Sequence, residues 1–221
     1  MQRLGIPVIA SGFLGGSTGR EIYQLLKAEK LKQHFIQIGE SSRINITVSS
    51  NLDHHQTRLS FLGPKIKSSE KTELFDYIEK HNNISLIVLG GSLPPGFTSA
   101  DVIRLIKLAT KKNIDTVVDC PGSILSQVLK AKPLLIKPNL EEFQVMLGSN
   151  IKTIKSVVRE AKSLLSMVRF ICVSSVEGGA VLVTHQGCYF GKVPDLKVRS
   201  TVGAGDSMVG AMVAQLYNSN D

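Results

Sequence analysis

Residues 200–210 read Ser-Thr-Val-Gly-Ala-Gly-Asp-Ser-Met-Val-Gly. Gly203, Ala204 and Gly205 precede an acid, Asp206, and an apolar run follows, which predicts a buried helix beginning near Asp206. Glycines before a helix let successive N–H groups point to one place, as phosphate and oxyanion sites require. A carboxylate there can take a proton from an attacking hydroxyl group. On this pattern alone, a glycine-rich turn with an Asp N-cap is an equally good interpretation.

Composition bounds the class of protein. A chain of 221 residues is long enough for one large α/β domain and short for two. The net charge of +8 is spread along the chain, which favours a solvated basic surface or a pocket for phosphorylated substrates. The absence of Trp disfavours nucleic-acid binding, and no apolar run reaches membrane-spanning length. We therefore expect neither a nucleic-acid nor a membrane partner.

The chain has three cysteines, Cys120, Cys172 and Cys188, and no C-x-x-C motif. Each lies in or beside an apolar stretch. An odd count without metal-ligand spacing predicts buried free thiols in a reducing compartment, so we expect a cytoplasmic protein.

Apolar strands alternate with amphipathic helices along most of the sequence. We expect strands near 7–13, 84–89, 115–119, 134–136, 170–174 and 180–183, with helices between them. The run 84–89 is continuously apolar, which predicts a strand buried on both faces. Residues 43–49 and 59–61 alternate as an antiparallel pair, with His54 and His55 exposed near its turn. This spacing predicts an α/β fold with a doubly wound, mainly parallel sheet flanked by helices.

The first helix is expected behind the glycine loop 15–19. Thr18 and Glu21 have the spacing of a capping box, and the inward side chains are expected to be Ile22, Leu25 and Leu26. This loop could cradle a phosphate, although a plain strand-to-helix turn is the better interpretation.

Two stretches could bind a sugar phosphate. Arg43 and Asn45 share a strand face, although a solvated face explains the pattern better when it is taken alone. The loop 90–96, Gly-Gly-Ser-Leu-Pro-Pro-Gly, follows a strand end, where open α/β sheets bind ligands. Ser92 is its candidate ligand, and a rigid turn is the alternative.

A third stretch, Lys137-Pro138-Asn139-Leu140-Glu141-Glu142, follows the strand at 134–136. Asn139 and Glu142 have capping-box spacing, which explains them locally. A cap does not exclude a role near a metal ion, because Mg²⁺ keeps several waters and needs few protein ligands.

Together these motifs resemble the PfkB carbohydrate kinases, which have the ribokinase-like fold. The string at 201–210 is similar to their C-terminal signature, and the segments 42–45, 91–96 and 137–142 are similar to further family elements. The resemblance implies that Asp206 is the catalytic base and that Gly203, Ala204 and Gly205 form the anion hole. It implies that Arg43, Asn45 and Ser92 bind the sugar phosphate. The nucleotide-binding residues that it implies are Lys137, Asn139, Ser174 and Thr201, with Asn139 and Glu142 organising Mg²⁺ through water.

The function that the resemblance implies is ATP-dependent phosphorylation of a phosphorylated ketohexose. The expected substrate is fructose 6-phosphate or fructose 1-phosphate, giving fructose 1,6-bisphosphate, with tagatose-6-phosphate kinase as the alternative. The expected partners are the sugar phosphate, ATP and Mg²⁺, and a homodimer is an open expectation. The alternative from another class is a truncated, inactive nucleotide-binding protein. One departure from the family supports it, because Val176 stands where the family has a glycine beside the nucleotide.

The resemblance also bears on domain organisation. It predicts one ribokinase-like domain over residues 1–221 that is incomplete at both ends. Before Met1 we expect a first strand, lid strands and a Gly-Gly segment that binds the sugar. After Asp221 we expect helices that cover the adenine.

Overall fold

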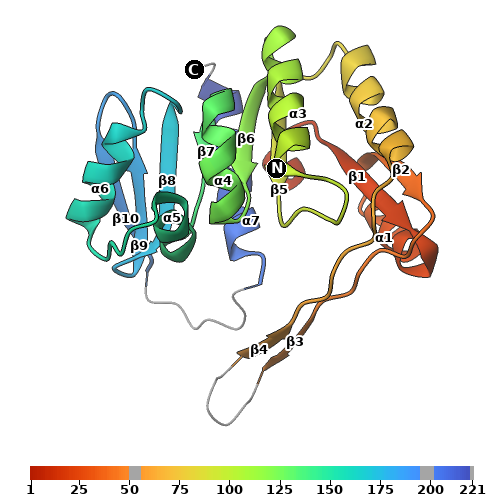
Figure 1. Cartoon of the computed structure of the whole chain (residues 1–221), viewed down its shortest axis with the longest axis horizontal. Helices are drawn as coiled ribbons and strands as arrows, with labels where there is room; N and C mark the ends of the chain where they lie inside the picture. The colour runs from red at the N-terminus through yellow and green to blue at the C-terminus, as the bar shows by residue number, and fades with distance from the viewer. Residues whose placement is uncertain (50–55, 195–201, 220–221) are drawn as a thin grey trace. The chain divides into compact units, whose positions relative to one another are not determined.

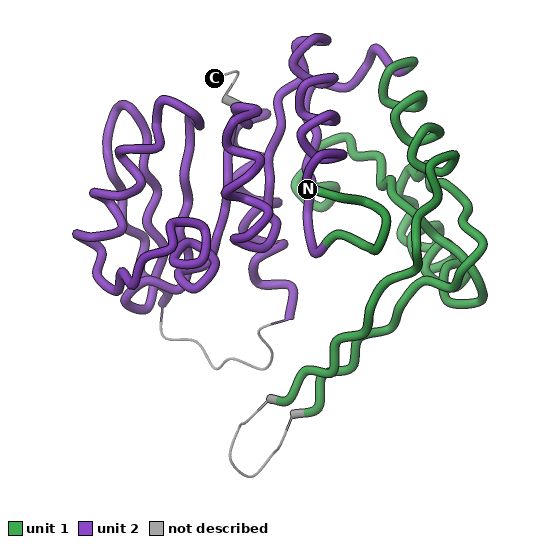
Figure 2. Tube along the Cα trace, viewed as in Figure 1, with its two compact units in different colours: residues 1–80, 93–98 green, residues 81–92, 99–221 purple. Residues whose placement is uncertain are grey.

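The computed structural model describes residues 1–49, 56–194 and 202–219. The chain forms two compact units (Figure 2). The first comprises residues 1–80 and 93–98, and the second comprises 81–92 and 99–221. The expectation of one domain over residues 1–221 stays a prediction.

The first unit is built on a parallel pair of strands. β1 (Ile9–Gly15) and β2 (Lys32–Ile38) pair along their length and are joined by α1 (Gly16–Ala28). α2 (Ser68–Lys80) packs against β2, and η1 (Gln2–Leu4) is a short 3-10 turn at the start. The ring of Phe97 lies 5.7 Å from that of Phe13 and 6.5 Å from that of Phe75, so the returning segment 93–98 completes this core.

An antiparallel ribbon also belongs to the first unit. β3 (Ile46–Ser49) pairs with β4 (Gln56–Leu59), as the alternating pattern predicts. Ile46 lies opposite Leu59, and Val48 lies opposite Thr57. The apolar side chains Ile46, Val48 and Leu59 are all exposed. His54 and His55 lie outside the described residues.

The second unit is a six-stranded sheet with the order β10-β9-β8-β7-β6-β5. Its strands are β5 (Leu86–Gly90), β6 (Asp115–Asp119), β7 (Leu135–Ile136), β8 (Phe170–Val176), β9 (Gly179–Val183) and β10 (Cys188–Lys192). β5, β6, β7 and β8 run parallel to one another. β9 pairs antiparallel with β8, and β10 pairs antiparallel with β9. The mainly parallel α/β sheet is therefore confirmed, and its parallel strands end at one common edge.

Helices cover the sheet of the second unit on both sides. α3 (Ser99–Lys111), α4 (Gly122–Val128), α5 (Leu140–Leu147) and α6 (Ile154–Ser163) lie in front of it, and α7 (Ala204–Ser219) lies behind it (Figure 1). The turn η2 (Leu129–Ala131) follows α4. The fully buried side chains between sheet and helices include Leu105, Ile106, Val117, Val118, Leu125, Ile136, Phe143 and Ile171.

Three local predictions from the sequence are wrong, each for a packing reason. β5 is half-buried rather than buried on both faces, because it is the edge strand of its sheet and, among the residues that the structure describes, pairs only with β6. α1 begins after Gly15 without a side-chain cap, so the Thr18–Glu21 capping box does not form. Leu25 is 62% exposed, because the buried position of α1 is Gly19.

The cysteines differ from one another in exposure. All three are free thiols, and Cys120 and Cys172 are buried as predicted. Cys188 is exposed, because it begins β10, a strand at the edge of the sheet whose five residues are all exposed. In the part of the chain that the structure describes, no helix combines the length and apolar character needed to cross a membrane.

Candidate active site

The glycine turn before α7 is the centre of the candidate site. Gly203 adopts a φ of 81°, and α7 begins at the next residue, with the Ser207 amide donating to the Gly203 carbonyl oxygen at 2.9 Å. Asp206 is therefore the third residue of the helix, which begins two residues earlier than its position suggested. Its side chain is exposed. Thr201 lies outside the described residues, so its predicted nucleotide role stays a prediction.

The helix behind the turn is fixed by its apolar face. Val209, Val213 and Ala214 are buried, whereas Met208 and Met212 are only half-buried. The inward face is thus centred on the valines rather than on the methionines. This packing places Asp206 on the solvent side of the first turn, where a carboxylate can meet a ligand and where the helix dipole favours anions.

A buried lysine lies against this turn. Lys137 follows β7 and is 4% exposed, and its Nζ lies 3.1 Å from Asp119 Oδ1. A Cβ atom added to Gly205 would lie 3.4 Å from the same Nζ. Glycine at position 205 therefore lets the turn pass close to the ammonium group, and the structure brings Lys137 and Gly205 together.

The charges around Lys137 are coupled. Burial raises the pKa of the Asp119 carboxyl group; the Lys137 ammonium opposes that rise, and the charge of Asp206 adds to it. Burial also raises the pKa of the Cys120 thiol to about 12 and that of Cys172 to about 11. These two thiols stay protonated at neutral pH and are poor nucleophiles.

Asn139 and Glu142 form the predicted capping box of α5. The Glu142 amide donates to Asn139 Oδ1 at 2.8 Å, and the Asn139 amide donates to Glu142 Oε2 at 2.9 Å. This reciprocal cap fixes both side chains at the carboxyl end of β7. A carboxylate has about four acceptor positions, so the cap leaves Glu142 able to accept further bonds, for example from water.

Ser174 lies beside this cap. Its amide donates to the Pro138 carbonyl oxygen at 3.0 Å, and it forms a parallel bridge with Asn139. The next residue, Ser175, has a φ of 61° at an irregularity of β8. Val176, which the resemblance places beside the nucleotide, is fully buried, so its side chain packs in the core of the second unit.

The predicted sugar-phosphate residues divide between the units. Arg43 and Asn45 belong to the first unit, and both contact the backbone of Phe61. Arg43 Nη1 donates to the Phe61 carbonyl oxygen at 3.3 Å, and the Phe61 amide donates to Asn45 Oδ1 at 3.1 Å. These bonds brace the base of the ribbon, so a role in binding phosphate stays a prediction.

Ser92 belongs to the second unit and is exposed just after β5. The loop that carries it is tied to the end of β6, because the Gly91 amide donates to the Asp119 carbonyl oxygen at 2.9 Å. Ser92, just after β5, and Asp119, at the end of β6, thus lie at the ends of neighbouring strands, at the same edge of the sheet.

Asp119, which pairs with Lys137 beside the glycine turn, is a candidate residue that the sequence analysis did not single out. The signal was available, because Asp119 is the last residue of a predicted strand, where open α/β sheets bind ligands. The same rule that marks the loop after β5 also marks the end of β6, which pairs with both β5 and β7.

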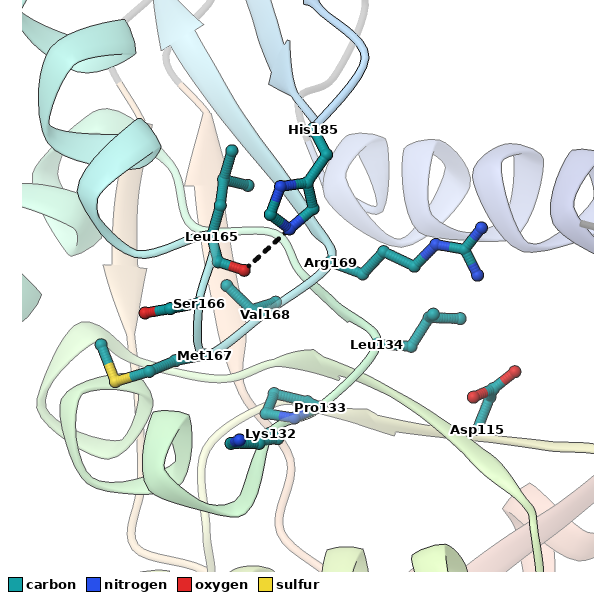
Figure 3. A pocket seen from close by; sticks show the side chains of 10 residues that line it. All are labelled: Asp115, Lys132, Pro133, Leu134, Leu165, Ser166, Met167, Val168, Arg169 and His185. Atoms are coloured by element: carbon teal, nitrogen blue, oxygen red, sulfur yellow. Dashed lines mark hydrogen bonds between the residues drawn. The ribbon is translucent and has the colours of Figure 1, made fainter.

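A pocket with a volume of ≈ 260 Å³ lies at the opposite edge of the sheet. It is lined by Asp115, which begins β6, and by Arg169, which precedes β8 (Figure 3). His185 Nε2 lies 3.1 Å from the Leu165 carbonyl oxygen within it. Because it adjoins the amino ends of the parallel strands, this pocket is not part of the candidate site.

Comparison with known proteins agrees with this geometry. The model of the family described as pfkB family carbohydrate kinase matches residues 1–221. The chain is 30% identical to a 1-phosphofructokinase of Bacillus subtilis (strain 168), over 97% of this chain and 70% of that protein. It is 31% identical to a tagatose-6-phosphate kinase of Staphylococcus epidermidis, over 99% of this chain and 71% of that protein.

A solved structure shows the same architecture. The crystal structure of phosphofructokinase-2 from Escherichia coli in complex with substrates and products superposes with a TM-score of 0.92 at 30% identity. The superposition covers 98% of this chain and 71% of that one. The ribokinase-like fold expected from the sequence is confirmed.

Proposed function

Because the chain belongs to the pfkB family of carbohydrate kinases, we propose that it transfers the γ-phosphoryl group of ATP to a hydroxyl group of a phosphorylated ketohexose. The acceptor is fructose 6-phosphate or fructose 1-phosphate, and the product is fructose 1,6-bisphosphate. The names of the related sugar-phosphate kinases support this assignment. The observation that carries it is the exposed carboxylate of Asp206 in the first turn of α7, directly behind the Gly203–Gly205 turn.

Asp206 is the general base in this proposal. Its carboxylate takes the proton of the acceptor hydroxyl group as that oxygen forms a bond to the γ-phosphorus. The bond from the γ-phosphorus to the β–γ bridging oxygen breaks, and ADP leaves with that oxygen. Backbone amides of the glycine turn stabilise the charge on the transferring group, because fixed donors need no reorganisation during the reaction.

Asn139 and Glu142 would hold Mg²⁺ indirectly, through water. Among the described residues no cluster of three or more His, Cys, Asp or Glu side chains could enclose a metal ion. A donor set of one amide and one carboxylate fits an ion that keeps several waters and binds substrate phosphates. When bound, Mg²⁺ neutralises negative charge on the phosphates of ATP.

The remaining binding roles follow the family positions. We propose that Lys137, Asn139, Ser174 and Thr201 contact the nucleotide, and that Arg43, Asn45 and Ser92 bind the sugar phosphate. The joined segments Lys137–Asn139 and Ser174 support the first group, because the Ser174 amide donates to the Pro138 carbonyl oxygen and Asn139 pairs with Ser174 in a parallel bridge.

Tagatose 6-phosphate is the second candidate acceptor. The 31% identity to a tagatose-6-phosphate kinase favours it as strongly as the other relative favours fructose 1-phosphate. Fructose and tagatose differ at one hydroxyl configuration, and fructose 1-phosphate and tagatose 6-phosphate differ also in the carbon that carries the phosphate. None of the contacts described above selects between them. The choice therefore belongs to experiment.

We further propose self-association through the β3–β4 ribbon and a cytoplasmic location. Ile46, Val48 and Leu59 expose 46%, 56% and 46% of their surface on this ribbon, and contiguous exposed apolar side chains mark interaction surfaces. The free thiols Cys120, Cys172 and Cys188 support a reducing compartment.

The experiment that tests the function is ADP release by the purified 221-residue chain. The assay supplies Mg-ATP with fructose 6-phosphate, fructose 1-phosphate or tagatose 6-phosphate in separate reactions. Turnover with one sugar phosphate supports the proposal and names the acceptor. Isothermal titration with ATP, run in parallel, would reveal nucleotide binding without turnover, which would support the inactive nucleotide-binding alternative instead.

A further inference from the structure

The Lys137–Asp119 ion pair is the feature of the second unit that the proposed reaction leaves unexplained. The Lys137 and Asp119 side chains are 5% and 17% exposed, and their charged atoms lie 3.1 Å apart. Burial of an ion pair costs free energy of desolvation and is weak support for stability. A pair buried at the ligand-binding edge of a sheet therefore calls for a role beyond folding.

The backbone ties both partners to that edge. Asp119 ends β6 and Lys137 follows β7, and the Lys137 amide donates to the Val118 carbonyl oxygen at 3.1 Å. The lysine stem starts on a rigid strand end and is enclosed along its length, since Lys137 as a whole is 4% exposed. Its ammonium group has one described carboxylate partner, Asp119.

The ammonium group lies against the turn that precedes Asp206. A Cβ atom at Gly205 would stand 3.4 Å from Nζ and 3.9 Å from Cε of Lys137. Burial raises the pKa of the Asp119 carboxyl group. The positive charge of Lys137 lowers that pKa, and the negative charge of Asp206 raises it further. Two carboxylates and one ammonium group thus share the surroundings of the glycine turn.

We propose that Asp119 is a positioning residue, which holds the Lys137 ammonium group against Gly205 so that its charge acts on the transferring phosphoryl group. This inference rests on the proposed function. Lysine carries a compact charge on a flexible stem with several rotamers, so a fixed partner is needed to keep it in one place. A cation fixed beforehand stabilises developing negative charge without reorganisation, which a mobile one does not.

The test is a double-mutant cycle on kcat with Asp119→Asn, Lys137→Met and the double variant. Loss of one fixed charge-stabilising group costs about 10²-fold in kcat. We expect a loss of that size for each single variant and the same loss, not its square, for the double variant. Asp115→Asn is the matched control, because it removes a carboxylate from the exposed amino end of the same strand and leaves kcat unchanged.

Thermal unfolding of the same four proteins separates positioning from folding. Asp119→Asn leaves a buried unpaired ammonium group and lowers Tm, and Lys137→Met added to it removes that charge and restores Tm. If Asp119 served only to stabilise the fold, Asp119→Asn would lower Tm but keep the wild-type kcat at temperatures where it is folded, because Lys137 would still be present. We expect its kcat to fall at those temperatures too. In the double variant the ammonium group is gone. We expect Tm to recover while kcat stays as low as in Lys137→Met.

The outcomes distinguish this inference from the proposed function. No turnover by the wild-type chain with any of the three sugar phosphates contradicts the proposed function, and the Tm cycle still reports whether the ion pair is formed. Wild-type turnover with full kcat in Asp119→Asn overturns the inference alone. Losses that multiply in the double variant also overturn it, because Asp119 would then act independently of Lys137.

Discussion

Asn139 and Glu142 hold one another in place: the Asn139 amide donates to Glu142 Oε2 at 2.9 Å, and the Glu142 amide donates to Asn139 Oδ1 at 2.8 Å. The same two residues begin α5 and provide the oxygen ligands proposed to organise Mg²⁺. A helix cap and a metal-organising pair therefore share atoms. A change that preserves the cap but alters the charge can separate the two roles.

Glu142→Gln is that change. Gln at this position retains a side-chain oxygen for the Asn139 amide, so the capping box and the stability of the fold should persist. Loss of the negative charge should raise the Mg²⁺ concentration needed for half-maximal turnover by about 10- to 100-fold, the usual cost of losing an outer ligand. Turnover measured across a Mg²⁺ series checks this.

The control is Glu141→Gln, which removes the same charge from the exposed neighbouring position of α5. It should leave the Mg²⁺ dependence unchanged. An unchanged Mg²⁺ dependence in Glu142→Gln as well would remove Glu142 from the metal site and leave it as a helix cap.

Gly122, the first residue of α4, lies against the backbone of Glu142 in α5. A Cβ atom at Gly122 would collide with the carbonyl oxygen of Glu142, so only glycine lets α4 approach the first turn of α5 this closely. Gly122→Ala should lower the free energy of unfolding by about 1–3 kcal/mol, the usual cost of overpacking. It should also reduce turnover by displacing Glu142. Urea denaturation and ADP release measure the two effects.

Gly191→Ala is the comparison, because an added Cβ there meets no atom within 4 Å and the residue is exposed on β10. Equal stability losses in the two variants would show that the contact between Gly122 and Glu142 is not as close as the structure has it.

The buried thiols predict a loss of stability at alkaline pH. Burial raises the pKa of Cys120 to about 12 and that of Cys172 to about 11, from 9.0 for an unperturbed thiol. Above pH 9 the unfolded chain releases these protons while the folded chain keeps them. The free energy of unfolding therefore falls as pH rises through this window, by up to about 1.4 kcal/mol per pH unit for each thiol.

Urea denaturation between pH 8 and pH 10 tests this, with Cys120→Ala/Cys172→Ala against Cys188→Ala. The double variant should show a shallower alkaline decline, whereas Cys188→Ala, which changes an exposed thiol, should follow the wild type. Identical slopes in all three proteins would contradict the assigned burial.

The ribbon offers a test of self-association. Ile46 and Val48 share one face of β3, and Thr47 lies on the other. If the apolar face is an interface between copies of this chain, Ile46→Lys/Val48→Lys should convert the assembly into monomers. Light scattering after size-exclusion chromatography measures this, with Thr47→Lys as the control that keeps the assembly. A wild-type chain that is monomeric at micromolar concentration would refute the interface.

The sequence was most informative where local chemistry alone determines the structure. The Asn139–Glu142 cap and the bounds of β6 were predicted correctly because hydrogen-bond spacing and apolar runs act within a few residues. The long match at 201–210 gave the family, since few other patterns place an acid behind such a turn. These features were sufficient to predict the fold, and the roles assigned to the site residues stay predictions.

What the sequence could not give depends on contacts between distant segments. β5 is half-buried because of its place at the sheet edge, which strand order decides. Leu25 is exposed because α1 turns Gly19 inward, and the helical pattern did not reveal that choice. Asp119 lies 3.1 Å from Lys137 because β6 and β7 are neighbours in the sheet, and the sequence pattern does not show that neighbourhood.

The most direct test of the central claim is turnover by Asp206→Asn under saturating Mg-ATP and the preferred sugar phosphate. The side chain is exposed and Asn is close to Asp in size and shape, so Tm should stay near that of the wild type. Loss of the general base should lower kcat by about 10²- to 10⁴-fold with little change in the KM for ATP. A folded Asp206→Asn chain that turns over at the wild-type rate would contradict the assignment of Asp206 as the base.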